Sequence, residues 1–370
     1  MRVCRLSVCL LVSTLGAVAC GDDSSPSGPG TTPSALAAPA PSSPADAAQL
    51  ATLRPTFVVT NSTSAQSGTR TYEFQVSDRS DFSASTPGTL AGFTVSVNPT
   101  GLAEGAGGTT SYAVQSDLQP ATRMYWRSRV TQGATTSAWS AARTFNTQLV
   151  GYNRAGELFD PLTGGVSIGT PVGSYTFVAG KGIKLNDQNS YVRYQLAQTI
   201  ANGEMSLEAE GFYPNGPGEK LKVFSMMDGS ANLLQSKYNL STQYRGLNGN
   251  PPNAISFKAV FGDEDFKLEP DFGQRLAAAM ALDPTRVYYW KASWSNEFRV
   301  IVEQGRGGPR IYELAVSSRG STYAPNPHFA FVGSSNGPFG EEAGSWPGVT
   351  YRNVWISSVP RPATLGNAVN

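Results

Sequence analysis

The chain contains 370 residues, with 28 Lys and Arg, 27 Asp and Glu, and one histidine. The near-neutral charge argues against a nucleic acid or a charged membrane surface as partner, and the lone His328 excludes His-rich metal sites and disfavours a Ser-His-Asp triad. With 39 Gly, 25 Pro and few long helical patterns, the composition predicts an all-β protein of two domains.

Residues 1–19 have the layout of a secretory signal peptide. Two arginines precede an apolar run from Leu6 to Ala19 that is too short to span a bilayer. All three cysteines, Cys4, Cys9 and Cys20, lie in or beside this segment. The remainder of the chain therefore has no disulfide, no Cys-based metal site and no Cys nucleophile.

The residues before Cys20 resemble the lipobox of bacterial lipoproteins. Small residues in Leu15-Gly16-Ala17-Val18-Ala19 precede the cysteine and a polar stretch follows it, with Ala17 where the family usually has Leu. The resemblance implies that Cys20 is acylated and anchors the protein in the bacterial cell envelope, so that the membrane is contacted through lipid only. Because Gly21 follows Cys20, ahead of Asp22-Asp23, we expect delivery to the outer membrane. The alternative is ordinary signal cleavage, which would release a secreted protein.

Residues 20–48 predict a disordered linker, because Ser, Pro, Ala and Gly cannot bury enough surface to fold. Residues 49–148 predict an antiparallel sandwich, since short alternating segments are separated by Gly, Ser, Thr and Asn clusters. In one such segment, the period of two predicts that Met124, Trp126, Ser128 and Val130 share a buried face. Leu118 to Trp126, followed by Trp139 and Phe145, resembles the end of a fibronectin type III domain, which implies a spacer.

Residues 151–362 predict a second, larger β domain, followed by a tail at 363–370. A hairpin is expected where a three-residue turn follows Trp294, and one helix is expected from about Phe272 to Leu282. The strand order resembles the concanavalin A-like lectin/glucanase jelly roll, including laminin-G-like and alginate-lyase-like modules. That resemblance implies that the last strand closes the sheet near the first. The expected strands are Tyr191–Leu196, Met205–Glu210, Leu221–Met226, Ala254–Val260, Val287–Trp294, Phe298–Val302 and Tyr351–Ser357.

Carboxylates in this domain do not follow a glucanase pattern. Glucanases of this fold carry acidic residues at alternate positions of one strand, so that they face the same cleft. The acid-rich stretch 261–271 has different spacing, and its Gly and Pro predict a solvated loop in which Asp263 and Asp265 are weak candidates for calcium. The predicted function requires no cofactor. Glu208 and Glu210 share a strand face, as is common on solvent-facing sheets.

An alginate-type lyase is the enzymatic alternative. Its β-elimination needs a group that neutralises the uronate, together with a base and an acid, commonly Tyr and His. Residues 289–296 resemble the lyase strand "YFKAGVYN", but Ser295 stands at the place of the catalytic tyrosine, and Met226-Met227-Asp228 replaces the expected amide and histidine. If the chain is a lyase, the catalytic candidates are Arg193, Tyr289, Lys291 and His328.

Binding without catalysis is the favoured hypothesis, because a sugar site needs only exposed aromatic faces with amides and basic groups nearby. The expected partner is a polysaccharide, with uronic-acid polymers included. An adhesive surface protein with a protein partner is a further alternative. The predicted ligand-binding residues are Arg193, Tyr213, Tyr244, Arg245, Lys258, Lys291 and Trp346.

Overall fold

The computed structural model describes residues 36–64, 67–83, 96–97, 101–228, 238–261, 267–268, 280–295, 297–317, 326–335 and 344–368. The predicted signal peptide, Cys20, Asp263, Asp265 and most of the predicted helix lie outside these ranges. Within them, no helix is both long and apolar enough to cross a membrane. Apart from a short 3-10 turn at Ala106–Gly108, the regular structure of the described ranges is strand, so the fold is all-β.

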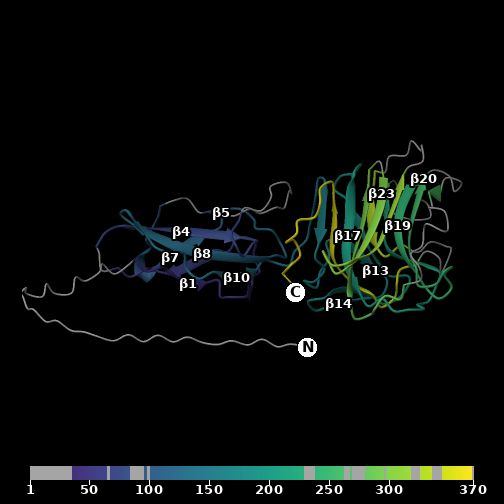
Figure 1. Cartoon of the computed structure of the whole chain (residues 1–370), viewed down its shortest axis with the longest axis horizontal. Coiled ribbons are helices and arrows are strands. Elements are labelled where there is room, and N and C mark those ends of the chain that lie inside the picture. The colour runs from purple at the N-terminus through teal and green to yellow at the C-terminus, as the bar shows by residue number, and fades with distance from the viewer. Residues whose placement is uncertain are drawn as a thin grey trace, which may run out of the picture.

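The strands form two sandwiches, which Figure 1 shows as two lobes placed end to end. The first sheet of the N-terminal sandwich has the order β1 (Ala40–Ser43), β3 (Thr56–Thr60) and β7 (Thr109–Ala113). Its second sheet has the order β2 (Ala48–Gln49), β10 (Arg143–Asn146), β8 (Arg123–Gln132), β4 (Arg70–Ser77) and β5 (Ser96–Val97), with β6 (Leu102–Ala103) on β4 and β9 (Thr135–Thr136) on β8.

The N-terminal sandwich begins earlier than the sequence predicted. Leu36 is buried in its core and β1 starts at Ala40, inside the stretch expected to be a linker. The alternation predicted for β8 is confirmed, because its residues alternate strictly between buried and more exposed. Trp126 is fully buried and its ring centroid lies 4.8 Å from that of Phe57 on the facing sheet. The fibronectin resemblance of this sandwich stays a prediction.

The C-terminal sandwich is larger and confirms the predicted jelly-roll architecture of two antiparallel sheets. The seven-stranded sheet has the order β13 (Thr170–Val172), β16 (Tyr191–Gln195), β25 (Phe329–Val332), β18 (Lys220–Met227), β19 (Tyr238–Arg245), β20 (Ile255–Phe261) and β21 (Lys267–Leu268). The nine-stranded sheet has the order β11 (Tyr152–Arg154), β12 (Glu157–Asp160), β26 (Thr350–Ser357), β17 (Gly203–Glu210), β22 (Val287–Trp294), β23 (Glu297–Gln304) and β24 (Arg310–Ser317), with β14 (Tyr175–Val178) and β15 (Gly182–Leu185) beside it.

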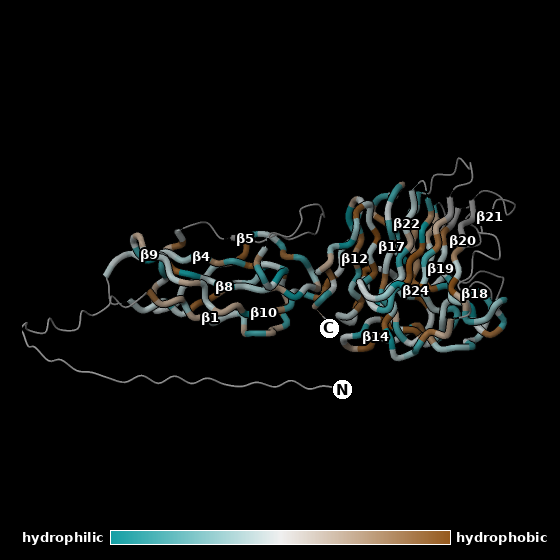
Figure 2. The backbone as a smooth tube through the Cα atoms, viewed as in Figure 1, coloured by the Kyte–Doolittle hydropathy of each residue, from teal (hydrophilic) through white to brown (hydrophobic). Residues whose placement is uncertain are grey.

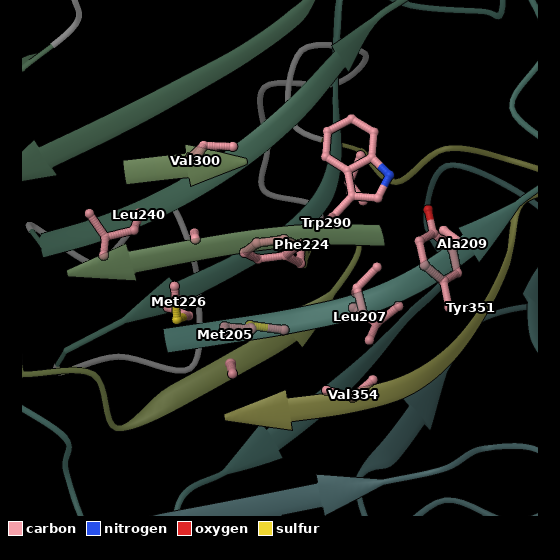
Figure 3. Close-up of a cluster of buried hydrophobic side chains, with 14 of the residues drawn as sticks. Met205, Leu207, Ala209, Phe224, Met226, Leu240, Trp290, Val300, Tyr351 and Val354 are labelled. Atoms are coloured by element: carbon pink, nitrogen blue, oxygen red, sulfur yellow. The ribbon is translucent and has the colours of Figure 1, made fainter. Parts of the chain in front are cut away.

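The core of this sandwich lies between the two sheets. Figure 2 shows hydrophobic residues interspersed with hydrophilic ones along the strands. Because successive side chains of a strand point to opposite faces, the hydrophobic ones can gather on the face that lies toward the other sheet. Figure 3 shows Leu207 and Trp290 of the nine-stranded sheet packed in one cluster with Phe224 and Leu240 of the other. The last strand, β26, pairs with β12 and β17, as the resemblance to concanavalin A-like proteins implied.

The C-terminal segment after β26 packs at the junction of the two lobes. Leu365 and Ala368 are buried with Phe159 and Trp355 of the nine-stranded sheet and Ala121 of the N-terminal sandwich. Hydrogen bonds cross the same junction: the Thr364 hydroxyl donates to Asp78 at 2.6 Å, and the Ala368 amide donates to the carbonyl of Ala121 at 3.0 Å. Residues 364–368 therefore connect the lobes.

Truncation of the chain after Pro362 is expected to loosen the two lobes. The change removes the buried Leu365 and the hydrogen bonds of Thr364 and Ala368. Loss of a buried leucine alone costs about 2–5 kcal/mol. Small-angle X-ray scattering should show a wider distribution of lobe separations than in a control chain that ends at Ala368. Superimposable scattering from the two chains would show that this segment does not hold the lobes together.

Candidate functional site

One cross-strand row spans the outer face of the seven-stranded sheet. Backbone pairing joins Arg193 of β16 to Phe331 of β25, and Phe331 to Ser225 of β18. The row continues through Ser241 of β19 to Lys258 of β20. Because paired residues in antiparallel strands share a face, these five positions lie on one side of the sheet. The opposite side faces the core, where Phe224 and Leu240 are buried.

Charge is distributed very unevenly between the two sheets. The described strands of the seven-stranded sheet contain no Asp or Glu, whereas those of the nine-stranded sheet contain eight. The register places every Lys and Arg of the seven-stranded sheet on its outer face. We call this surface the basic face. Its basic residues are Arg193, Lys220, Lys222, Arg245, Lys258 and Lys267.

Aromatic and hydroxyl groups accompany the charges on the basic face. Phe331 and Met227 form a small buried cluster there with the partly exposed Tyr191 and Phe329. The ring centroids of Tyr191 and Phe331 are 5.8 Å apart. Sugar rings stack on aromatic faces of this kind, while polar groups beside them fix orientation. Because Phe331, Ser225 and Ser241 are buried, the partly exposed Tyr191 and Phe329 supply the aromatic surface of the basic face.

The basic residues of this face differ in exposure. Arg193 is exposed, whereas Arg245 and Lys222 are buried and donate hydrogen bonds to nearby backbone carbonyls. Arg245 donates to the Asn250 carbonyl at 2.7 Å, and burial lowers the pKa of its guanidinium. Lys222 donates to the Lys220 carbonyl at 3.1 Å. The side chains of Lys258 and Lys267 fall outside the described part of the structure. Arg193 is therefore the basic residue best placed to meet a ligand from solvent.

Tyr244 and Trp346 are core residues, which corrects their prediction as exposed ligand contacts. Both are fully buried, and their ring centroids are 5.1 Å apart. The Trp346 indole donates to the Tyr244 carbonyl at 2.6 Å, and the Tyr244 hydroxyl donates to the Met280 carbonyl at 2.9 Å. Tyr213 is half-buried and packs edge-on against Trp346. Burial raises the pKa of both tyrosines.

The two predicted site residues Arg193 and Lys291 do not share a site. Lys291 and Tyr289 lie on β22, on the outer face of the nine-stranded sheet, where both line one pocket. Arg193 lies on the outer face of the opposite sheet, and His328 immediately precedes β25 of that sheet. The four lyase candidates are therefore divided between two surfaces, and Arg193 and Lys291, both predicted as ligand-binding residues, cannot contribute to one sheet-face site.

Glu208 is buried, which corrects the interpretation of its strand face as solvated. Its carboxylate accepts hydrogen bonds from Arg352 and from Asn353, each at 3.2 Å, and forms an ion pair with Arg361 at 3.2 Å. The sequence signal for this network was the run of Glu204, Glu208 and Glu210 on one face of a single strand. The basic partners of Glu208, Arg352 and Arg361, follow about 150 residues later, so spacing alone did not join them.

Lys222 and Phe331 of the basic face were not among the residues predicted to bind a ligand. The signal that could have identified the basic face was the absence of Asp and Glu from the seven described strands of this sheet, which individual motifs do not reveal. Within the described ranges, no group of three or more His, Cys, Asp or Glu side chains is arranged to hold a metal ion. The calcium candidates Asp263 and Asp265 lie outside those ranges and stay predictions.

No family model and no curated protein matches the chain. Solved structures with similar folds include the Ca²⁺-bound exoplasmic/lumenal domain of VIP36, with a TM-score of 0.33, 9% identity, and coverage of 54% of this chain and 88% of that one. The enzymatically active domain of tailspike protein 2 from bacteriophage CBA120 gives a TM-score of 0.37, 15% identity, and coverage of 61% and 34%. The kappa-carrageenase zobellia_236 of Zobellia galactanivorans gives a TM-score of 0.28 and 13% identity, with coverage of 45% of this chain and 71% of that one. Likeness at these TM-scores does not define what this chain binds.

Proposed function

We propose that the C-terminal sandwich binds an acidic polysaccharide across the basic face. The observation that carries this proposal is the charge of the sheet: its described strands contain six basic residues on the outer face and no acidic residue. A surface of one sign attracts polymers of the opposite sign and orients them on approach. Glu219, which pairs with Lys220 at 3.1 Å at the start of β18, is an acidic neighbour of this face.

The row from Arg193 to Lys258 favours an extended ligand. The two residues are separated by four inter-strand intervals, which at about 4.8 Å each amount to roughly 19 Å. A single sugar ring cannot bridge this length, whereas a chain of several uronic-acid units can contact both ends. Phe331 within the row is buried, but Tyr191, which packs against it, is partly exposed to a ligand that follows the row. The proposed ligand is therefore an extended anionic polysaccharide, such as a uronic-acid polymer.

The proposed activity is binding without cleavage. A β-elimination requires its neutralising group, base and acid around one sugar unit. The predicted lyase residues are divided, with Tyr289 and Lys291 on the nine-stranded sheet and Arg193 and His328 on the other. This separation favours a lectin-like role for the sandwich over the lyase alternative.

The proposal includes attachment to the cell envelope. Cys20 would carry the lipid, residues 21–35 would give reach, and the N-terminal sandwich would act as a spacer between the anchor and the sugar-binding sandwich. The support is the sequence around Cys20, which resembles a lipobox and suggests the outer membrane. Labelling with radioactive palmitate in a bacterial host tests the anchor, because a Cys20→Ala chain should take up no label.

Replacement of Arg193 by alanine is expected to weaken binding of polygalacturonate about tenfold. A hydrogen bond to a charged group contributes about 1.5–3 kcal/mol, and each 1.4 kcal/mol changes affinity tenfold. Isothermal titration of the full chain provides the measurement. Arg299→Ala is the matched control, because Arg299 is partly exposed on the opposite sheet, where it pairs with Glu297. Equal weakening by both changes would contradict the site. Release of products with unsaturated ends would contradict the non-catalytic role.

A further inference from the structure

A second candidate site lies on the outer face of the nine-stranded sheet. A pocket of about 280 Å³ opens there between the sheet and the C-terminal segment. β22 contributes Tyr289 and Lys291, which project to the same side because they are two residues apart on one strand. Arg306, from the turn between β23 and β24, and Arg361, which follows β26, form other parts of its wall.

Positive charge exceeds negative charge in this pocket. Its lining holds three cations, Lys291, Arg306 and Arg361, and one carboxylate, Glu204. Arg361 is neutralised by the buried Glu208 at 3.2 Å. Lys291 and Glu204 lie 3.8 Å apart, which is a loose pair that leaves the ammonium able to contact another acceptor. Arg306 is therefore the one cation of the described pocket lining whose charge has not been matched with a carboxylate.

Arg306 makes hydrogen bonds to neutral oxygens. It donates to the Leu365 carbonyl at 2.8 Å, to the Asn367 amide oxygen at 3.0 Å, and to the Ala363 carbonyl. In the described part of the chain, no carboxylate lies within ion-pair distance of Arg306, and the nearby Glu303 accepts from the Gly307 amide at 2.9 Å. Burial, followed by the charge of Arg361, lowers the pKa of Arg306 to about 10. Cations withdrawn from water are normally paired with an anion.

We propose that this pocket binds a carboxylate or sulfate group of a small acidic ligand. Lys291, Arg306 and the Tyr289 hydroxyl supply donors around the excess charge. Ligand pockets usually measure about 300–1,000 Å³, so a volume of about 280 Å³ admits one small molecule or one charged unit of a larger one. The site is separate from the basic face, because it lies on the other sheet.

Titration of the full chain with sodium glucuronate, sodium sulfate and glucose tests this site. Glucuronate carries a carboxylate, sulfate is the second group that the proposal names, and glucose is the neutral control. We expect at least one anion to bind, with a dissociation constant about tenfold higher in Lys291→Met, since a charged hydrogen bond is lost. Lys181→Met is the matched control, because Lys181 pairs with Glu210 of the same sheet outside the pocket. It should bind the anion like the unchanged protein.

Two further variants keep the result interpretable. Tyr289→Phe retains the ring and removes only the hydroxyl, so its binding should weaken while its unfolding curve stays close to that of the unchanged protein. In a chain that already carries Arg193→Ala, Lys291→Met should still weaken anion binding about tenfold, which separates the pocket from the basic face. Glucuronate binding tighter than sulfate identifies a carboxylate ligand, and the reverse identifies a sulfate. The proposal is overturned if neither anion binds, or if Lys291→Met and Tyr289→Phe both bind like the unchanged protein.

Discussion

Replacement of Trp346 by alanine is expected to lower the free energy of unfolding by about 3–5 kcal/mol, the range for large aromatic residues in cores. Trp346 is fully buried among Phe212, Tyr213 and Tyr244, whose ring centroids lie within 5.9 Å of its own. Its indole also donates a hydrogen bond to the Tyr244 carbonyl. The change therefore leaves a large cavity and an unsatisfied carbonyl. Urea unfolding followed by circular dichroism measures the loss.

Tyr213→Ala is the control for this experiment. Tyr213 packs against the same indole, with ring centroids 5.1 Å apart, but it is only half-buried, so its removal should cost clearly less. A Trp346→Phe chain, which retains an aromatic ring, should fold well enough for binding measurements and should bind polygalacturonate like the unchanged protein. If Trp346→Ala left stability intact and abolished polysaccharide binding, Trp346 would be a ligand contact after all.

Strand positions could be predicted from this sequence because alternation of apolar and polar residues is a local property. In β8 the period of two identified the buried residues Met124 and Trp126 correctly. The hairpin of β22 and β23 was also correct, since a turn of two or three residues leaves little choice of partner. The start of the first sandwich was missed because Ala40–Ser43 contains no apolar alternation and is held by pairing with β3.

Site residues were harder to predict, because function depends on which strands become neighbours. Trp346 is surrounded in sequence by Gly, Ser and Pro, which suggested an exposed loop. In the structure Trp346 is instead buried in the core. Its indole lies so close to Gly216 that a side chain at position 216 would clash with it. Likewise, Arg193 and Lys291 both lie on strands with suitable alternation, but alternation does not say that the strands belong to opposite sheets.

The charged residues on the two outer faces of the C-terminal sandwich differ in sign and in pairing. On the seven-stranded sheet the described strands carry basic and no acidic residues, and Glu219 beside the start of β18 pairs with Lys220, so the charge of this face is predominantly positive. On the nine-stranded sheet the buried Glu208 of β17 is matched by Arg352 and Arg361 from the C-terminal part of the chain. The second arrangement holds the C-terminal segment in place, so its charges serve stability except at the pocket around Arg306.

Replacement of Glu208 by glutamine is expected to cost about 3–5 kcal/mol at neutral pH, since it leaves buried arginines without their counter-ion. The Glu208 side chain is only 11% exposed, and that of Arg361 only 2%. Burial acts to raise the pKa of Glu208, but the charges of Arg361, Arg352 and Arg306 outweigh it and lower the pKa below its ordinary value of 4.5. The carboxylate is therefore ionised in the folded protein wherever it is ionised in the unfolded chain.

The lowered pKa fixes the direction of the pH dependence. The stabilising contribution of Glu208 is fully present above about pH 4.5, because both states are then ionised. As the pH falls below that value, the unfolded chain takes up a proton first, and the contribution declines until the folded carboxyl is protonated too. The difference in unfolding free energy between the unchanged protein and Glu208→Gln should therefore be largest near neutral pH and should shrink in acid.

Urea unfolding at several pH values from neutral to strongly acidic checks this result. Glu210→Gln is the matched control, since Glu210 lies on the same face of β17, pairs with Lys181, which is 59% exposed, and lies only at the longer distance of 3.8 Å from Arg352. A pair with such an exposed partner contributes about 0–1 kcal/mol, and Arg352 keeps its closer contact with Glu208, so this variant should lose clearly less stability than Glu208→Gln at neutral pH. If the two variants lost equal stability, or if the cost of Glu208→Gln stayed constant in acid, the carboxylate of Glu208 would not be the counter-ion that holds Arg352 and Arg361.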